Sequence, residues 1–263
     1  MPREPHQGNA GRPKCGCLTV IPVDESRRKF LGTTAAAAGA LALAPGVMLY
    51  SYAEAKVGSG AGERTIRWGM LVDTTKCATG CTACVDACHT EHAIPAPKRP
   101  TDVQWIRKVE LKDNRTGAVH SMPVMCQHCA EPPCVDVCPT GASFKRADGI
   151  VMVDRHTCIG CRYCMMACPY KARSFVHEPT TNKTSAAPRG KGCVESCTMC
   201  VHRVDKGGTP ACVEACADAG HRAIIFGDLN DPSSEIAKRV KAATTSQLRA
   251  DLRTDNGVRY QGL

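Results

Sequence analysis

The chain has 263 residues, 19 of them cysteine, and only 4% of its residues are aromatic. This composition excludes a conventional core built on aromatic side chains, and so many cysteines indicate that covalent or metal links stabilise the fold. The net charge of +9 is typical of proteins that bind nucleic acid or a membrane surface, unless bound anionic groups neutralise it.

The first 55 residues resemble a twin-arginine export signal. The run Ser26–Leu31 contains two consecutive arginines, an alanine-rich apolar stretch continues to Leu49, and an Ala-x-Ala site ends at Ala55. Cleavage after Ala44 and retention of the segment as an anchor are alternatives, although the apolar run is short for a membrane span. We therefore expect an exported, periplasmic protein that folds before export, and this route favours metal sites over disulfides.

Sixteen of the cysteines form four tetrads along the rest of the chain. The third tetrad has the bacterial ferredoxin spacing C-x2-C-x2-C-x3-C-P, in which three thiolates bind one 4Fe-4S cluster and the fourth reaches a second cluster. The first tetrad departs from this form, because it has three residues in its first gap. In chain order the tetrads are Cys77, Cys81, Cys84, Cys88; Cys126, Cys129, Cys134, Cys138; Cys158, Cys161, Cys164, Cys168; and Cys197, Cys200, Cys212, Cys216.

Short apolar segments precede and follow the tetrads. Residues 68–73 and 149–154 are rich in branched side chains, and each ends in Val-Asp four residues before a cysteine, so we predict two strands and an internal repeat. Residues 172–177 and 223–226 are predicted to be the closing strands of two hairpins. The last cysteine of each tetrad is expected in a short helical turn, which a proline ends in the second and third tetrads.

The segments between and after the tetrads are polar. Residues 91–100 and 180–191 are predicted to be surface loops that could meet partner subunits. The run Asp231–Glu235 is typical of a helix start, and residues 236–243 of a short amphipathic helix. The tail beyond has few apolar residues, so we expect it to wrap the domain or to dock on another chain. We thus predict a leader at 1–55, a four-cluster domain at 56–227, and a C-terminal helix and docking tail at 228–263.

Iron-sulfur clusters explain these cysteine spacings better than a single metal ion does. Zinc sites use cysteine pairs separated by longer stretches, so a zinc-stabilised interaction module is the alternative of another class, chiefly for the fourth tetrad. The first tetrad also has the C-x3-C-x2-C spacing of radical SAM enzymes. That class is a disfavoured alternative, because those enzymes need most of a barrel to hold their cosubstrate. Four clusters with their thiolates would carry about −8 together, so the basic charge requires no nucleic-acid partner.

The other three cysteines lie outside the tetrads. We interpret Cys15 and Cys17 as leader residues without a metal role, and Cys193 as a buried thiol that binds no metal. The sequence contains neither a nucleophile with its base nor a glycine-rich nucleotide loop. We therefore expect an electron-transfer subunit that catalyses no bond chemistry of its own.

The order of the tetrads identifies a family resemblance. With the segments CQHCAEPPCVDVCPTGA, CTMCVHRVDKGGTPACVEAC and FGDLNDPSSE, the chain resembles the four-cluster ferredoxin subunits of the dimethyl sulfoxide reductase electron-transfer family, from about residue 66 to residue 234. The leader, the first-gap insertion and the ending LRADLRTDNGVRYQGL look most like the Dsr transmembrane complexes of sulfur-metabolising prokaryotes. The resemblance implies an α+β fold of two tandem, pseudo-symmetric bacterial ferredoxin-like halves with two 4Fe-4S clusters each.

The resemblance also implies which cysteines share a cluster, and a role. The implied role is a periplasmic relay between an integral-membrane, quinone-interacting subunit and a cytochrome c or other redox subunit, with membrane association through these partners. A molybdopterin reductase, a nitrite reductase or a hydrogenase is the alternative destination of the electrons. Ala217 follows Cys216 where the other half has proline, which predicts a different turn there. The implied ligand sets are Cys77, Cys81, Cys84 with Cys216; Cys197, Cys200, Cys212 with Cys88; Cys126, Cys129, Cys134 with Cys168; and Cys158, Cys161, Cys164 with Cys138.

Overall fold

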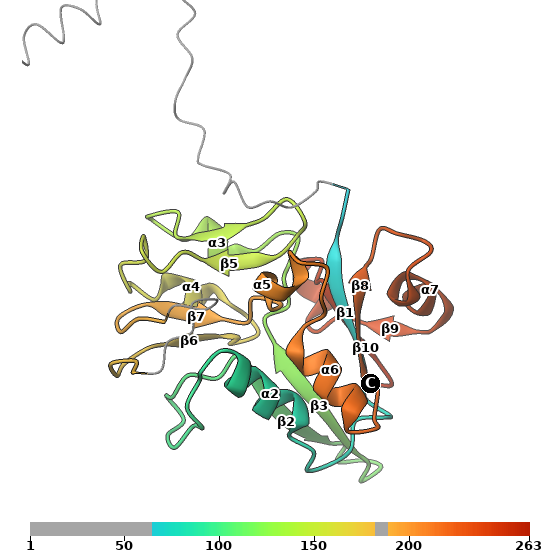
Figure 1. Cartoon of the computed structure of the whole chain (residues 1–263). Coiled ribbons are helices and arrows are strands. Elements are labelled where there is room, and N and C mark those ends of the chain that lie inside the picture. Colours follow the sequence, from blue (N-terminus) through green and yellow to red (C-terminus); the bar gives the residue numbers. More distant parts are fainter. Residues whose placement is uncertain (1–64, 182–188) are drawn as a thin grey trace, which may run out of the picture. The chain divides into compact units, whose positions relative to one another are not determined.

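The computed structural model of the chain describes residues 65–181 and 189–263, all within one unit, Glu54–Leu263 (Figure 1). The predicted leader at 1–55, with Cys15 and Cys17, lies outside the described residues, as does part of the loop predicted at 180–191. Within residues 65–181 and 189–263, no helix has the length and apolar character needed to cross a membrane.

A four-stranded sheet joins the first strand to the C-terminal tail. Its strand order is β8 (Ile224–Asp228), β1 (Trp68–Asp73), β10 (Val258–Gln261) and β9 (Thr245–Ser246). Strand β1 confirms the prediction at 68–73; it runs parallel to β10 and antiparallel to β8. The tail thus packs on its own domain, one of the two arrangements expected from its sequence.

Glycines allow the tail to approach β1 closely. The Gly257 carbonyl accepts a hydrogen bond from Met70 N at 3.0 Å, and a Cβ on Gly69 would lie 2.6 Å from that same carbonyl oxygen. Tyr260 is fully buried, and its hydroxyl donates to the Pro123 carbonyl at 3.2 Å. The sheet and the β2–β3 pair therefore share one core.

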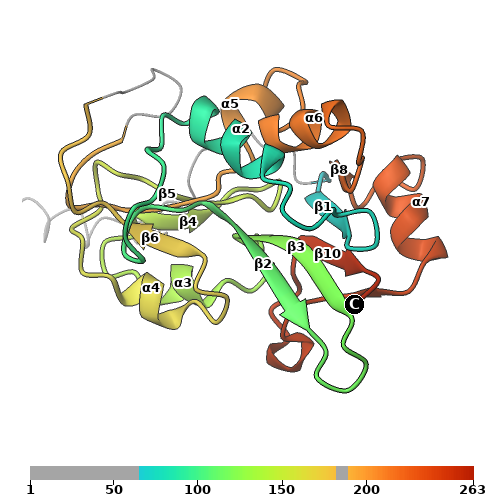
Figure 2. The same ribbon diagram turned by 90° about the horizontal axis from the view of Figure 1, so that it is seen from below.

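Two pairs of helices contain cysteines of the tetrads, and the presence or absence of a proline explains the difference in their lengths. Helices α2 (Ala83–Glu91) and α6 (Ala211–Asp218) lie side by side in Figures 1 and 2, apart from the shorter α3 (Pro133–Asp136) and α4 (Tyr163–Ala167). Cys168 precedes a proline and is extended, with φ −74° and ψ 111°, because the proline ring excludes helical geometry. No proline follows the last cysteine in α2 or α6, so these helices continue. At Cys216 this is the different turn that Ala217 predicted.

The remaining strands form three antiparallel pairs. They are β2 (Ile106–Lys112) with β3 (Val119–Met125), β4 (Ser143–Lys145) with β5 (Val151–Val153), and β6 (Arg173–Phe175) with β7 (Val194–Ser196). Strand β5 confirms the prediction at 149–154, and β6 and β8 lie where closing strands were predicted. The predicted hairpins were wrong, because β6 opens a pair with β7 and β8 pairs with the distant β1. Local apolar patterns specify a strand but not its partner.

The remaining helical elements are short. Helix α5 (Val201–Val204) follows Cys200, and a 3-10 turn, η1 (Ala250–Leu252), precedes β10. Helix α7 (Glu235–Ala242) confirms the predicted C-terminal helix. It is capped by Ser234, whose side chain accepts a hydrogen bond from the Ala237 amide at 3.1 Å.

Candidate iron-sulfur sites

Four cysteines from distant parts of the sequence line one cavity. We call this set group A: Cys77, Cys81, Cys84 and Cys216. Lys108 of β2 lies at the same cavity and donates from Nζ to the Cys77 sulfur at 2.9 Å. The first and fourth tetrads, 139 positions apart at their outermost cysteines, thus meet around a shared space.

A second cavity is lined by four cysteines of the middle tetrads. We call this set group C: Cys126, Cys129, Cys134 and Cys168. The tail reaches this group, because the Thr254 side chain hydrogen-bonds to Cys129 and the Tyr170 hydroxyl donates to Asn256 Oδ1 at 2.9 Å. All four cysteines of group C are buried.

The other two sets are identified by cysteines that lie close enough to shift one another's pKa. The pKa of Cys212 is raised first by burial and then by the charges of Cys197, Cys200 and Cys88. The pKa of Cys164 is raised by burial, partly offset by Arg173, and the charges of its neighbours Cys138 and Cys158 add to the rise. Group B is therefore Cys88, Cys197, Cys200 and Cys212; group D is Cys138, Cys158 and Cys164, with Cys161 in the same loop.

Groups A and B share two helices. Helix α2 carries Cys84 of group A and Cys88 of group B, one helical turn apart. Helix α6 carries Cys216 of group A and Cys212 of group B with the same spacing, and it packs against α2. The two groups are therefore neighbours.

Groups C and D exchange cysteines in the same way. Helix α3 contains Cys134 of group C, and Cys138 of group D follows its end. Helix α4 contains Cys164 of group D, and Cys168 of group C is its C-cap. The last cysteine of each middle tetrad thus lies just beyond the helical turn in which it was predicted.

One electrostatic interaction links the two pairs of groups. Burial raises the pKa of Cys126 in group C well above its ordinary value, Arg173 opposes this, and the charges of Cys134 and of Cys197 in group B add to the rise. Group B therefore lies next to group C, and the four groups follow one another in the order A, B, C, D.

The same backbone turn recurs in all four cysteine loops. The residue before the second cysteine has a positive φ in each: Gly80 at 76°, His128 at 43°, Gly160 at 72° and Met199 at 52°. Such a turn directs successive backbone N–H groups to one side and forms a concave, anion-binding surface. The additional residue in the first tetrad precedes this turn, so the insertion leaves the turn unchanged.

The inner groups are more sheltered than the outer ones. All cysteines of groups B and C are buried, whereas Cys77 and Cys81 of group A are half-buried and Cys161 of group D is exposed. Burial raises the pKa of Cys84 to about 11 and of Cys197 to about 12. These thiols are therefore neutral at pH 7 unless a metal displaces their protons.

Each group also receives a backbone N–H donor at a cysteine sulfur. In group A Ala223 N donates to Cys216 at 3.2 Å; in group B Met199 N donates to Cys197 at 3.4 Å; in group D Ser143 N donates to Cys138 at 3.3 Å. In group C the donor is the His128 amide, directed at Cys126. Such donors stabilise a thiolate and are typical of iron-sulfur loops.

Arg173 tests whether these groups suit an anionic cluster. Its side chain is 5% exposed and donates from Nη2 to the Cys134 sulfur at 3.1 Å and to Ser143 Oγ at 2.7 Å. Its Nε and Nη1 atoms are buried without a hydrogen-bond partner, and no carboxylate among the described residues pairs with it. A buried guanidinium without a counterion is costly, so the site fits a bound anion that also accepts hydrogen bonds.

A neutral donor takes the corresponding place at group B. His92 is 1% exposed, its Nε2 lies 3.3 Å from the Cys200 sulfur, and its ring packs against Trp105. Burial and the charge of His202 lower the pKa of His92 to about 4. His92 is therefore uncharged at pH 7 and can donate a hydrogen bond to a Cys200 thiolate.

The cysteines do not converge as they would around a single ion. In the part of the chain that the structure describes, no group of three or more His, Cys, Asp or Glu side chains is placed to hold one metal ion. Zinc would require four ligands around one point, at about 2.3 Å for sulfur. The arrangement around a cavity suits a larger, multi-atom cofactor.

Cys193 lies beside group D. Its thiol donates to the Arg155 carbonyl at 3.3 Å and is within hydrogen-bonding reach of the Cys158 side chain. It is half-buried, where the sequence had suggested a buried thiol. Each of the seventeen cysteines in the described residues is free of disulfide bonds.

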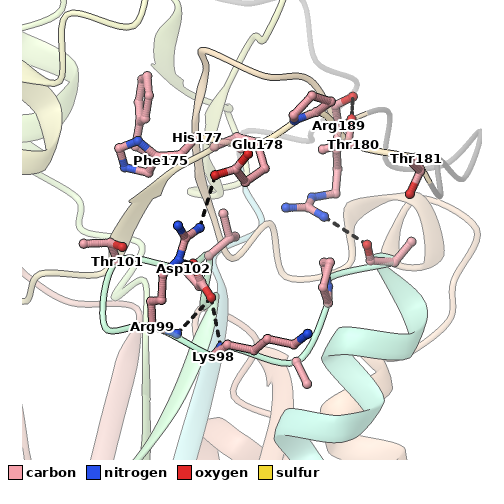
Figure 3. A pocket seen from close by; sticks show the side chains of 16 residues that line it. Lys98, Arg99, Thr101, Asp102, Phe175, His177, Glu178, Thr180, Thr181 and Arg189 are labelled. Carbon is pink, nitrogen blue, oxygen red and sulfur yellow. Dashed lines mark hydrogen bonds and ion pairs between the residues drawn. The ribbon is translucent and has the colours of Figure 1, made fainter.

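The two polar loops of the sequence enclose a separate cavity of about 290 Å³, and no cysteine lines it (Figure 3). Arg99 Nη2 donates to Glu178 Oε1 at 3.3 Å across it, and Arg189 Nη1 donates to the Ala93 carbonyl at 2.9 Å. These contacts bring residues 93–103 against residues 175–181 and against Arg189. The cavity is thus a feature of the loops and not of a cysteine group.

Several residues of the site carry no sequence signal. Arg173, Lys108, His92 and Thr254 lie outside the cysteine loops and reach the sulfurs only through the fold. Arg173 is one of 34 basic residues, and its neighbours in the sequence do not distinguish it. Only the burial of its guanidinium reveals its place.

Family models agree with this fold and these groups. Two models described as 4Fe-4S dicluster domains match the chain, one over residues 76–142 and the other over residues 117–228. Together they span all four tetrads and account for four 4Fe-4S clusters. Fold and site define an α+β, ferredoxin-like protein made of tandem dicluster domains, as predicted.

Similar proteins define the family. The chain is 41% identical to the Hdr-like menaquinol oxidoreductase iron-sulfur subunit 1 of Archaeoglobus fulgidus, over 90% of this chain and 98% of that protein. It is 37% identical to a subunit of the tetrathionate reductase of Salmonella typhimurium, over 83% and 80% of the two chains. It is 40% identical to protein NrfC of Escherichia coli, over 72% and 78%. The chain belongs to this family of ferredoxin-like 4Fe-4S subunits of oxidoreductases, and it is an electron-transfer subunit rather than a catalytic one.

Proposed function

We propose that groups A to D are the ligand sets of the four clusters and form a linear electron relay. Each cluster, when bound, supplies a one-electron carrier. The observation that carries the proposal is the order A, B, C, D, in which neighbouring groups share helices or lie close enough for the charge of one cysteine to shift the pKa of another. This order supports the ligand sets implied by the family resemblance, because groups A and C each line one cavity.

The exposure of the cysteines supports entry and exit at the two outer groups. The cysteines of groups B and C are shielded by the core, whereas groups A and D have cysteines close to the surface. Around group D the apolar side chains Ile159, Tyr163 and Met166 are 67%, 58% and 76% exposed. Contiguous exposed apolar side chains are typical of an interaction surface, so a partner subunit is proposed to cover group D.

The proposed partners are an integral-membrane subunit that exchanges electrons with quinone and a second redox subunit such as a cytochrome c. A relative named as an iron-sulfur subunit of a menaquinol oxidoreductase, matched over 98% of its length, supports the quinone link. The twin-arginine-like leader supports a periplasmic location, with membrane association through the partner. The ending of the chain supports a Dsr-type complex of dissimilatory sulfur metabolism.

A specific observation supports a second destination for the electrons. The chain is 37% identical to a tetrathionate reductase subunit and 40% identical to NrfC. A terminal reductase of that kind is therefore the alternative partner. The relay itself would be the same in either complex.

The relay can be tested in membranes that contain the intact complex. Addition of menaquinol should bleach the iron-sulfur absorption of this subunit within the turnover time of the complex. A variant with Cys200→Ala, which removes a ligand of group B, should show bleaching on one side of the break only. Complete bleaching at the wild-type rate in that variant would contradict a linear relay.

A further inference from the structure

The charge of Arg173 acts on cysteines of two different groups. It donates to Cys134 of group C at 3.1 Å, and the charges of Cys134, Cys126 and Cys164 raise its pKa against the opposing effect of burial. Cys164 belongs to group D. The guanidinium therefore lies between the two groups.

The fold fixes this position firmly. Arg173 is the first residue of β6, where it pairs with Ser196 of β7, and its Nη2 is also bonded to Ser143 of β4 at 2.7 Å. The residue as a whole is 5% exposed. Two of its three nitrogens are buried without a partner, so they can donate to a further acceptor between the groups.

Arg173 and Arg67 both lie near the His128 ring. Arg67 donates from Nη2 to the His128 carbonyl at 3.4 Å and to the Asp255 carbonyl at 2.9 Å, so it is held at the backbone. His128 Nδ1 accepts from Val151 N at 3.0 Å, which leaves its Nε2 as the protonated nitrogen. In the part of the chain that the structure describes, Arg173 forms no ion pair with a carboxylate, and the charges that raise its pKa most are those of cysteines.

We propose that Arg173 is a shared positioning residue that raises the reduction potentials of the clusters at groups C and D together. The proposal rests on the ligand sets proposed above. A fixed positive charge favours the reduced, more negative state of an adjacent cluster, and a hydrogen bond to a thiolate acts in the same direction. Each reduction adds one electron and changes no bond, and Arg173 keeps its proton throughout.

A shared cation has a consequence for the relay. Two adjacent clusters repel each other's added electrons, and a positive charge between them attracts both electrons and so offsets part of the energy of this repulsion. Arg173 would thereby stabilise the state in which the clusters at groups C and D are both reduced. Group A has its own cation, Lys108, whose Nζ lies 2.9 Å from the Cys77 sulfur.

The test is a redox titration of the purified holoprotein followed by EPR, with variants that separate charge from structure. Arg173→Gln retains hydrogen-bond donors without the charge, and Arg173→Lys retains the charge. We expect Arg173→Gln to move two of the four reduction steps to lower potential, and Arg173→Lys to restore them largely. Lys108→Met is the matched control and should lower one different step.

The outcomes separate this inference from the proposed function. Four clusters whose potentials are unchanged in Arg173→Gln would overturn the inference, and so would an equal shift of all four steps, which indicates a global structural change. Iron and sulfide contents below four clusters in the wild-type protein would overturn the ligand sets themselves. Equal iron contents in wild type and variants verify that the titration compares intact proteins.

Discussion

The half that holds groups A and B and the half that holds groups C and D use eight cysteines each in different structural settings. Helices α2 and α6 are nine and eight residues long and pack near a four-stranded sheet, whereas α3 and α4 have four and five residues and lie among two-stranded pairs. The difference begins with one residue type. Proline follows Cys138 and Cys168 but neither Cys88 nor Cys216.

The two halves differ in their cores as a result. The larger hydrophobic cluster contains Trp105, Tyr260 and Met70 and extends around groups A, B and C. The cluster around group D has only four buried residues, two of which are cysteines. Where so little apolar surface is buried, the metal cofactor replaces a hydrophobic core as the main source of stability.

Removal of iron should produce the largest difference between the two halves. After chelation, we expect the amides of β5 and β6 around group D to exchange fast with solvent. The hydrophobic cluster there has only four buried residues, which cannot maintain the fold once the metal cofactor that joins the cysteines is gone. The amides of β1, which pair on both sides, should remain protected. Hydrogen exchange with mass spectrometry measures both. Equal loss of protection in both halves would contradict the comparison.

Replacement of a buried cysteine should destabilise the fold more than replacement of an exposed one. Cys126→Ala and Cys161→Ala should each reduce iron from about sixteen to about twelve atoms per chain. Cys126 is buried in the main core, so its loss should also lower the unfolding temperature clearly, whereas loss of the exposed Cys161 should lower it little. Iron analysis and thermal unfolding check this. Similar unfolding temperatures for the two variants would be inconsistent with a core built around group C.

The recurring turn provides a matched pair of substitutions. A Cβ on Gly160 would lie 2.3 Å from the Gly192 carbonyl oxygen, while nothing lies within 4 Å of a Cβ on Gly80, and both residues have a positive φ. Gly160→Ala should destabilise the protein by about 2–4 kcal/mol, from strain and overlap together. Gly80→Ala should cost about 1–2 kcal/mol from strain alone. Denaturant unfolding of the holoprotein measures both, and equal costs would show that the surroundings of the two loops are alike.

The internal repeat should give the smallest effect. Asp154 accepts hydrogen bonds from His156 N at 2.9 Å and from Thr157 Oγ1 at 2.8 Å. Asp73 accepts from the backbone N at 3.2 Å and from the side-chain Oγ1 at 2.6 Å of a single residue, Thr75. Asp154→Ala should destabilise by about 0.5–1 kcal/mol, as for loss of a capping side chain.

The pH dependence of this effect follows from the pKa of Asp154. Hydrogen bonds from Thr157 and His156 hold that pKa below 3.8, so the carboxylate stabilises the folded state fully above that value and loses its effect as the pH falls through the lowered pKa. The difference between wild type and variant should thus be equal at pH 7 and pH 5 in thermal unfolding. A difference that shrinks by pH 5 would show that the carboxyl group is not held as described.

Local sequence patterns predicted the strands at β1 and β5 and the helix α7, because apolar alternation and capping residues act over a few positions. They did not predict that β8 pairs with β1 or that β10 lies between β1 and β9, since strand pairing depends on burial from distant segments. The cysteines themselves were evident from their spacing. The cations at their sulfurs, Arg173 and Lys108, were not, because a lysine or arginine in a strand has no spacing that marks it.

The most direct test of the four-cluster relay is the iron and acid-labile sulfide content of anaerobically purified protein, with an EPR spectrum after dithionite reduction. The account predicts about sixteen iron and sixteen sulfide per chain, with signals broadened by interaction between neighbouring reduced clusters. Zinc without sulfide would contradict it, as would four clusters that show no magnetic interaction.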